Sequence, residues 1–368
     1  MNLRFTVLNW NVGGAKFLEE KTKSERERTR TKINEALIAI LTDREMGPKP
    51  DVVTLQEIVR YRERDDEKVR DLFDEIPGYC YFPFPLIDSN LLSSKAKWNK
   101  IKGNSDWHDA TYFAQGNAFL IKEGCPHFPV WDLSNVDQPR PGKSKDHFIE
   151  LVHLDTGLYF GDRNTEPRAA LVAHFIYDPG DRPGTMKNDI RKPLDIFVIN
   201  LHLTTLMMER EGVPEIDALA AKMRQAQLDV IFNGIVSRYN SWRQGGYRER
   251  GEKREPEPQE SFKRHSPVWV MAGDFNFTEE SAEYAFIKRM NFIDTVPKRG
   301  KRTQWGQGTK ASGVGNDPTL TLDYIFAGPR FVSLDPAIYV QSNRVIHDHS
   351  IRASDHYPVL SSMTLIPS

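Results

Sequence analysis

The chain has 368 residues, of which 39% are hydrophobic, so it is long enough to bury a sizeable core. Its 50 basic and 51 acidic residues give a formal net charge of -1, which argues against a nucleic-acid binder that relies on overall positive charge alone. The sequence contains no run of about 18 apolar residues, so we expect no membrane span, and two cysteines are too few for a disulfide framework.

The N-terminal residues predict secondary structure rather than a targeting signal. Residues 1–12 have one basic residue before a short apolar stretch, and no small-residue cleavage site follows. We therefore interpret residues 3–11 as a first strand that ends at Asn11, and we expect a cytoplasmic protein. The alternative is that an export signal has been removed.

Apolar spacing predicts the next elements in chain order. Residues 22–42 carry apolar side chains at helical spacing behind a charged start, which predicts an amphipathic helix. A buried strand follows at 52–55 and ends in Gln56-Glu57. Residues 66–76 predict a second helix, and 79–107 predicts an irregular segment.

The rest of the chain alternates strands, helices and long loops. Further strands are predicted at 112–122, 168–177, 194–203, 268–272, 321–326 and 357–366. Helices are predicted at 214–240 and 279–290. We expect one domain over residues 1–368, with loop insertions near 85–110, 124–148 and 243–266.

Polar side chains recur where the predicted buried strands begin or end. They are Asn11, Gln56, Glu57, His202, Asp274, Asn276, Asp323, Asp355 and His356. Buried charges are costly when unpaired, so this recurrence predicts one shared cleft at a sheet edge. Oxygen ligands with few cysteines suit Mg²⁺, or Mn²⁺, better than zinc, and such a cation beside His and Asp suits hydrolysis of phosphate esters. The glycine-rich fingerprints GxGxxG and GxxxxGK[ST] are missing, which disfavours Rossmann and P-loop nucleotide binding.

Six short motifs occur in a fixed order along nearly the whole chain: "NWNVGG", "LQEI", "INLHL", "GDFN", "LDYIF" and "SDHYPV". Together they resemble the endonuclease/exonuclease/phosphatase superfamily, which has the deoxyribonuclease-I-like fold. This resemblance implies a four-layer α/β/β/α sandwich of two mixed sheets flanked by helices. It also implies a metal site in which Glu57 is the metal-binding glutamate, Asn11 is a metal or water ligand, and Asp355 completes or approaches the site.

The resemblance assigns the remaining motif residues to the phosphate. Asp274 corresponds to the aspartate that orients the attacking water or serves the leaving group, and Asn276 to the amide that holds a non-bridging oxygen. His356 corresponds to the imidazole that contacts the phosphate, paired with Asp323. His202 matches the branch of the family that has histidine here, where it binds phosphate or acts as an acid. The apurinic-endonuclease branch tends to have asparagine at this position, which disfavours abasic-site repair.

Several residues have an ordinary structural interpretation beside the functional one. His202 could be a satisfied core histidine, and Arg168 could either steer a substrate phosphate or cap a strand. Trp98, Trp107 and Tyr112, interleaved with lysines, suit stacking on bases or a solvated loop with aromatic residues beneath it. The histidines of 347–356 suggest either a zinc site or a loop over the cleft.

These observations together predict a Mg²⁺-dependent phosphodiesterase that acts on nucleic acid, with DNA slightly favoured over RNA, and no obligate protein partner is inferred. The alternatives are an enzyme for inositol phosphates, phospholipids or nucleotide-derived small substrates, one that cleaves a protein–nucleic-acid phosphodiester, or a catalytically silent nucleic-acid-binding module. A general base beside a cation must stay ionised, so we expect a low pKa for Asp274.

Overall fold

The structure is a computed structural model of the chain. It describes residues 3–14, 17, 20, 22–43, 49–63, 68–73, 75–88, 110–123, 131–132, 140–141, 148–154, 168–177, 194–204, 214–237, 267–295, 321–328, 337–346, 354 and 356–366.

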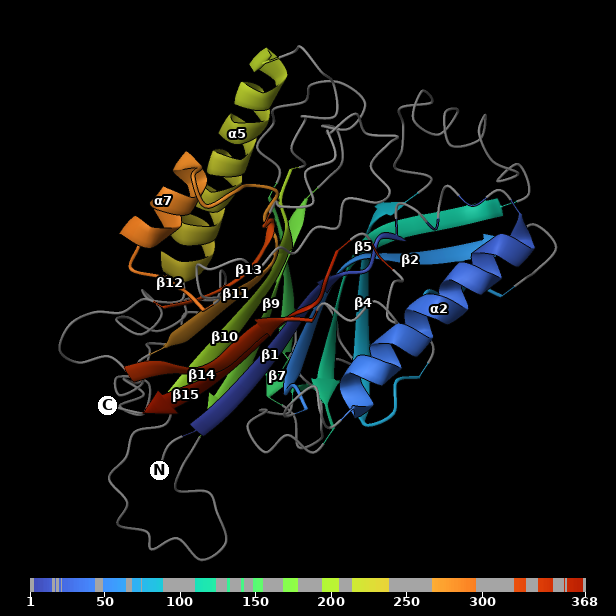
Figure 1. Ribbon diagram of the computed structural model, residues 1–368, viewed down its shortest axis with the longest axis horizontal. Coiled ribbons are helices and arrows are strands. Elements are labelled where there is room, and N and C mark those ends of the chain that lie inside the picture. Colours follow the sequence, from blue (N-terminus) through green and yellow to red (C-terminus); the bar gives the residue numbers. More distant parts are fainter. Residues whose placement is uncertain are drawn as a thin grey trace, which may run out of the picture.

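Two β-sheets form the centre of the described part of the molecule (Figure 1). The first has the order β14 (Ala337–Val345), β15 (Val359–Ile366), β1 (Leu3–Asn11), β2 (Val52–Glu63), β5 (Ala110–Lys122) and β4 (Tyr79–Asp88), with β3 (Arg70–Asp71) beside β2. The second has the order β12 (Ile293–Asp294), β13 (Asp323–Gly328), β11 (Val268–Asp274), β10 (Leu194–His202), β9 (Ala169–Tyr177) and β8 (Phe148–His153). The short strands β6 (Trp131–Asp132) and β7 (Arg140–Pro141) pair with each other.

Each large sheet contains one parallel pair among its described strands. β1 runs parallel to β2 in the first sheet, and β10 runs parallel to β11 in the second. Parallel neighbours need a crossover connection. The helix α2 (Lys23–Thr42) lies in the first crossover, and α5 (Pro214–Asp229) with the π-helical turn η2 (Val230–Val236) lies in the second. The C-terminal ends of each parallel pair therefore lie at one edge of their sheet.

The helices begin and end where their sequence signals lie. Thr22 caps α2: its hydroxyl accepts from the amide of Glu25, whose carboxylate accepts from the Thr22 amide, so the two residues form a capping box. Ser281 caps α7 (Ala282–Arg289) in the same direction, accepting from the amide of Tyr284. No described helix has the length and apolar character that a membrane crossing needs.

Three buried apolar clusters separate four layers. One lies between α2 and the first sheet and includes Ile33 and Leu37 of the helix. The second lies between the sheets and includes Phe5 and Ile196. The third lies between the second sheet and the helical pieces α5, η2 and α7. Figure 1 shows α2 on one side of the sheets and α5 with α7 on the other, which confirms the predicted sandwich of two mixed sheets flanked by helices.

The predicted helix at 66–76 is wrong. Arg70–Asp71 form the strand β3 instead, paired with Arg60 and Tyr61 of β2. Leu72, Phe73 and Ile76 have helical spacing, but they reach the α2-side core from a bend and irregular backbone. Tertiary packing therefore overrides the local pattern.

Two other expectations need correction. The stretch 79–107, predicted to be irregular, begins with the ten-residue strand β4. The strand at 52–55 does not end at Gln56-Glu57 but continues to Glu63. The strands β8 and β14 had no counterpart among the predicted elements. Most of the predicted loop insertions lie outside the described residues.

Candidate active site

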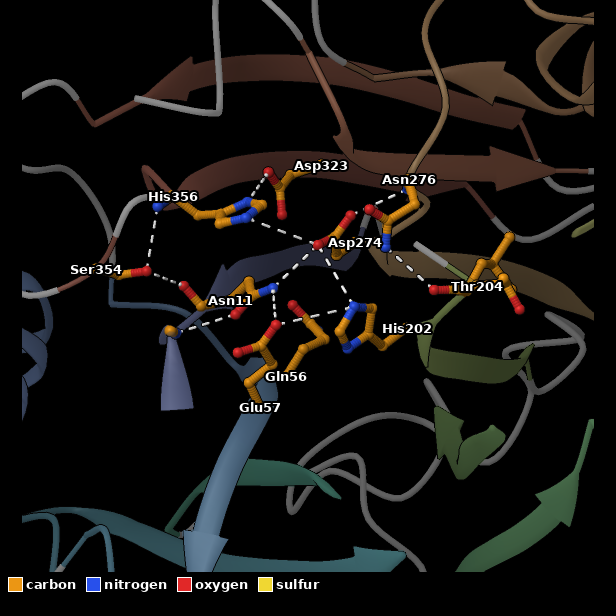
Figure 2. Close-up of polar contacts among 12 residues, drawn as sticks. Asn11, Gln56, Glu57, His202, Thr204, Asp274, Asn276, Asp323, Ser354 and His356 are labelled. Atoms are coloured by element: carbon orange, nitrogen blue, oxygen red, sulfur yellow. Dashed lines mark hydrogen bonds and ion pairs between the residues drawn. The ribbon is translucent and has the colours of Figure 1, made fainter. Parts of the chain in front are cut away.

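Strand register brings the polar strand ends together. Asn11 of β1 lies opposite Gln56 of β2, and His202 of β10 lies opposite Asp274 of β11. Asp274 is also opposite Asp323 of β13. Because the two sheets pack face to face, the ends of both parallel pairs meet in one polar cluster (Figure 2).

Glu57 reaches this cluster from a β-bulge. Between the pairs Leu55–Ala118 and Ile58–Gly116, β2 has two residues where β5 has one, Asn117. Glu57 adopts a left-handed backbone with φ 57°, which is disfavoured for any residue with a side chain. Such backbone strain concentrates at functional sites. The bulge turns the Glu57 side chain toward Asn11 and away from the regular alternation of β2.

Asn11 links the two sheets at the centre of the cluster. Its Nδ2 donates to Oδ2 of Asp274 at 2.9 Å and lies 3.3 Å from Oε1 of Glu57. Its Oδ1 accepts from the amide of Gly13, which fixes the direction of the side chain. Glu57 and Asp274, which come from different sheets, therefore share one amide donor.

The donor set here fits a hard divalent cation. Glu57 and Asp274 offer carboxylate oxygens. Asn11 donates from its Nδ2 to both carboxylates, and its Oδ1 faces the amide of Gly13 instead. Mg²⁺ is bound by such oxygen ligands, often one or two carboxylates completed by water and substrate. Asp274, Asp323 and His356 also place ligand atoms within 4.8 Å of one another and could hold a metal ion. The Nδ1 of His356 is engaged with Asp323, and its Nε2 lies 3.8 Å from Oδ2 of Asp274.

The carboxylate of Asp274 lies near both histidines of the site as well as Asn11 and Asn276. Its Oδ1 accepts from the amide of Asn276 at 3.0 Å, and its Oδ2 lies 3.6 Å from Nε2 of His202 and 3.8 Å from Nε2 of His356. Burial raises the pKa of Asp274 from 3.8 to about 7, against the lowering effect of His356. The low pKa expected from the sequence is therefore wrong for the ion-free chain. A nearby cation would lower this pKa again.

Three contacts hold His356, one at its imidazole and two at its backbone. Its Nδ1 bonds to Oδ2 of Asp323 at 2.8 Å. Its backbone amide donates to the hydroxyl of Ser354, which donates to the carbonyl of Asn11, and its carbonyl accepts from the indole of Trp10. The expected pairing of His356 with Asp323 is therefore present, and Nε2 is directed toward Asp274 (Figure 2).

Asn276 and His202 also contact the carboxylate of Asp274. Asn276 has a left-handed backbone with φ 54°, which asparagine tolerates better than most residues, and its Nδ2 donates to the carbonyl of Leu203. His202 lies 4.0 Å from Glu57 through its Nε2. Burial, together with the charges of Arg168 and His356, lowers the pKa of His202, so its imidazole is neutral at neutral pH.

A second set of buried polar residues supports the segment after His202. Gln227 of α5 both accepts from the amide of Thr204 and donates to its hydroxyl. Arg224 donates to the carbonyl of Thr204 and forms a buried ion pair with Glu283 of α7 at 2.9 Å. Sequence reasoning did not predict this support. The only signal was the presence of charged residues on helix faces that otherwise pack as core.

Of the other predicted site residues, Arg168 is described in full, and the rest lie wholly or partly outside the described residues. Arg168 is 8% exposed and close enough to Glu57 and Asp274 for their charges to act on it, and burial lowers the pKa of its guanidinium. This places it at the site rather than at a remote strand end. Trp98, Trp107 and Asp355 lie outside the described residues, as do the histidines at 347 and 349. Tyr112 belongs to β5, and only its backbone is described.

Comparisons with known proteins agree with this architecture. Residues 8–356 match the profile of the Endonuclease/Exonuclease/phosphatase family. The crystal structure of the endonuclease/exonuclease/phosphatase from Bacteroides vulgatus superposes with a TM-score of 0.53 at 14% identity, covering 99% of each chain. The human Nocturnin catalytic domain with bound sulfate anion gives a TM-score of 0.50 at 15% identity, covering 99% of this chain and 96% of that one. No curated protein sequence matches the chain. At these identities, the structural matches show a shared fold alone.

Proposed function

The chain belongs to the endonuclease/exonuclease/phosphatase family, and from this premise we propose that it is a Mg²⁺-dependent phosphodiesterase that hydrolyses nucleic acid, with DNA slightly favoured over RNA. One observation carries the chemical part of this proposal. Carboxylates, amides and imidazoles from both sheets converge on the buried carboxylate of Asp274. Such a group combines an oxygen site for a cation with a proton acceptor and donors for an anionic phosphate.

Glu57 would hold the cation, with Asp274 close enough to share it, and Asn11 would orient both carboxylates through its Nδ2. When bound, Mg²⁺ offsets the negative charge of the phosphate oxygens and so favours attack by water. The carboxylate of Asp274 accepts a proton from the attacking water as the water oxygen bonds to phosphorus. The ester bond on the opposite side breaks, and the leaving alkoxide takes a proton from solvent water.

Three groups are placed to bind the phosphate. His356 is oriented by Asp323 and directs its Nε2 into the cluster, where it donates to a phosphate oxygen. Asn276 uses one amide hydrogen on the carbonyl of Leu203 and keeps a second for a non-bridging oxygen. Arg168 supplies a fixed positive charge beside Glu57 and Asp274. Each donor favours the transition state because negative charge builds up on the phosphate oxygens it contacts.

Support for a nucleic-acid substrate comes from the sequence. Aromatic and lysine residues alternate between 95 and 112, and this combination suits stacking on bases and neutralising a phosphate backbone. The stretch includes Trp98, Trp107 and Tyr112, which we propose as substrate-binding residues.

A substrate panel with Mg²⁺ tests the proposal. We expect turnover of single-stranded or plasmid DNA, or of RNA, that EDTA abolishes, and a loss of at least about 10² in rate for Asp274→Ala. Asp229→Ala is the matched control, because Asp229 is an exposed carboxylate at the end of α5, outside the site. Turnover of inositol phosphates or other small esters without nucleic acid would assign the alternative substrate class. Binding of DNA without turnover of any substrate would refute an enzyme.

A further inference from the structure

Four fully buried polar side chains lie one layer deeper than the active site. Asn9, Thr54 and Gln56 come from the first sheet, and Asn200 comes from the second. Asn9 and Asn200 precede Asn11 and His202 by two residues, so in each strand they share a face with a site residue. The proposed chemistry uses none of the four.

Asn200 reaches across from the second sheet to the backbone of the first. Its Nδ2 donates to the carbonyl of Leu55 in β2 at 3.1 Å and to the carbonyl of Ala118 in β5 at 2.7 Å. Its Oδ1 accepts from Nε2 of Gln56 at 2.8 Å. Carbonyl oxygens can only accept, so the two backbone contacts define which end of the Asn200 amide faces β2.

These two carbonyls belong to the residue pair at which the bulge begins. Leu55 and Ala118 are the last partners in regular register before Gln56 and Glu57 face the single residue Asn117. Gln56, the first residue of the bulge, is held at both of its amide hydrogens, by Asn200 and by Oδ1 of Asn9. Asn200 therefore contacts the backbone on both strands of the bulge and a side chain within it.

The bulge matters because it places Glu57. The left-handed backbone of Glu57 is unfavourable by itself, so the surrounding contacts must hold it. Gly14 packs against the Glu57 carbonyl so closely that a Cβ atom at position 14 would collide with it. The contact with Gly14 restricts the backbone of Glu57 from the β1 side. Asn200 restricts Leu55 and Gln56, the two residues before Glu57, from the facing sheet.

We propose that Asn200 is a positioning residue for the cation site: it fixes the β2 bulge and thereby the direction of the Glu57 carboxylate toward Asn11 and Asp274. The inference rests on the proposed function, which assigns Glu57 as a cation ligand. It adds that cation affinity depends on an uncharged side chain that touches neither the ion nor the substrate. Residues that orient metal ligands typically change metal affinity 10- to 100-fold when they are replaced.

Direct Mn²⁺ binding, measured by electron paramagnetic resonance on the full chain, tests this without relying on turnover. We expect Asn200→Leu, which keeps a side chain branched at Cγ and removes both donors, to weaken Mn²⁺ binding about tenfold or more. Asn200→Ser, with one short donor, is a second variant in case the leucine does not fold, and we expect it to weaken binding as well. The matched control is Thr54→Val. Thr54 bonds to Asn9 and the Leu8 carbonyl in the same buried network but contacts neither carbonyl at the bulge.

Thr54→Val should lower the thermal unfolding temperature and leave Mn²⁺ affinity within about twofold of the parent chain. Unchanged affinity in the folded Asn200 variants, or an equal loss in Thr54→Val, would overturn the positioning role. The variant Glu57→Gln distinguishes a failure of the positioning role of Asn200 from a failure of the proposed function. If the parent chain binds Mn²⁺ no better than Glu57→Gln, the cation site itself is wrong, whatever the Asn200 variants do.

Discussion

The buried carboxylate of Asp274 should make the ion-free protein less stable as the pH rises. Its pKa is 3.8 in an ordinary environment and about 7 in the folded chain, with burial as the largest cause. Below about pH 4 the carboxyl is protonated in both the folded and the unfolded chain. Between about pH 4 and pH 7 the unfolded chain loses this proton while the folded chain keeps it, so the free energy of unfolding falls as the pH rises.

The size of this effect follows from the two pKa values. One pKa unit corresponds to about 1.36 kcal/mol, so the rise from 3.8 to about 7 corresponds to about 4 kcal/mol, lost in full above the folded-state pKa. Asp274→Asn removes the titration and keeps the shape. An amide cannot accept from both Asn11 and the amide of Asn276 as the carboxylate does, which costs about 1 kcal/mol for one hydrogen bond. In EDTA at about pH 8.5, Asp274→Asn should therefore be more stable than the parent chain by about 3 kcal/mol.

Urea unfolding followed by tryptophan fluorescence, in EDTA from about pH 5 to about pH 9, measures this difference. The stability gap between Asp274→Asn and the parent should widen with pH, whereas the exposed Asp229→Asn should show a gap that stays constant. Saturating Mg²⁺ should then stabilise the parent more than Asp274→Asn, because ligands stabilise the state that binds them. A gap that does not vary with pH, or a variant less stable than the parent at pH 8.5, would refute the assignment of a buried, destabilising charge to Asp274.

The left-handed backbone of Glu57 predicts that Glu57→Gly is more stable than Glu57→Ala by about 1 kcal/mol, since only glycine adopts φ 57° without a steric cost. Urea unfolding of the two variants checks this, and equal stabilities would contradict the strained bulge. Asp323→Asn should lower kcat about 10² or more, because Asp323 orients His356 through the 2.8 Å contact. Asp195→Asn is its control: Asp195 bonds to His174 at the same 2.8 Å but lies at the opposite end of β10 from the site, so kcat should not change. Equal losses in the two variants would show that the effect is not specific to the site.

Elements whose pattern reflects their own burial could be predicted from the sequence. The strands β10 and β11 are mostly apolar, and β1 alternates apolar residues with Arg4 and Thr6 before Leu8. The polar residues at the ends of these strands mark where each one reaches the sheet edge. In contrast, β14 has the exposed Tyr339, a polar stretch and a bulge, as expected for a strand at the edge of a sheet, so its pattern does not distinguish it from a loop.

The bulge at Glu57 could not be predicted because its cause is distant in the chain. The polar pair Gln56-Glu57 after an apolar run indicates a strand end by every local rule. The strand continues because Ile58, Val59 and Tyr61 are buried against α2. The contacts that fix the bulge come from Asn200, 144 residues from Gln56, which no pattern within β2 could reveal.

The site is divided between the two sheets, and this division explains how its parts depend on each other. Contacts within the site that cross from one sheet to the other include Asn11 to Asp274, His202 to Glu57, and His356 to Asp323 and Asp274. The proposed cation ligand Glu57 therefore comes from the first sheet, and the proton acceptor Asp274 comes from the second. Their distance is set by the apolar core between the sheets, which begins directly beneath the buried amides. A core change that alters the spacing of the sheets should affect cation affinity and rate together, whereas a change on the helical side of either sheet should affect stability first.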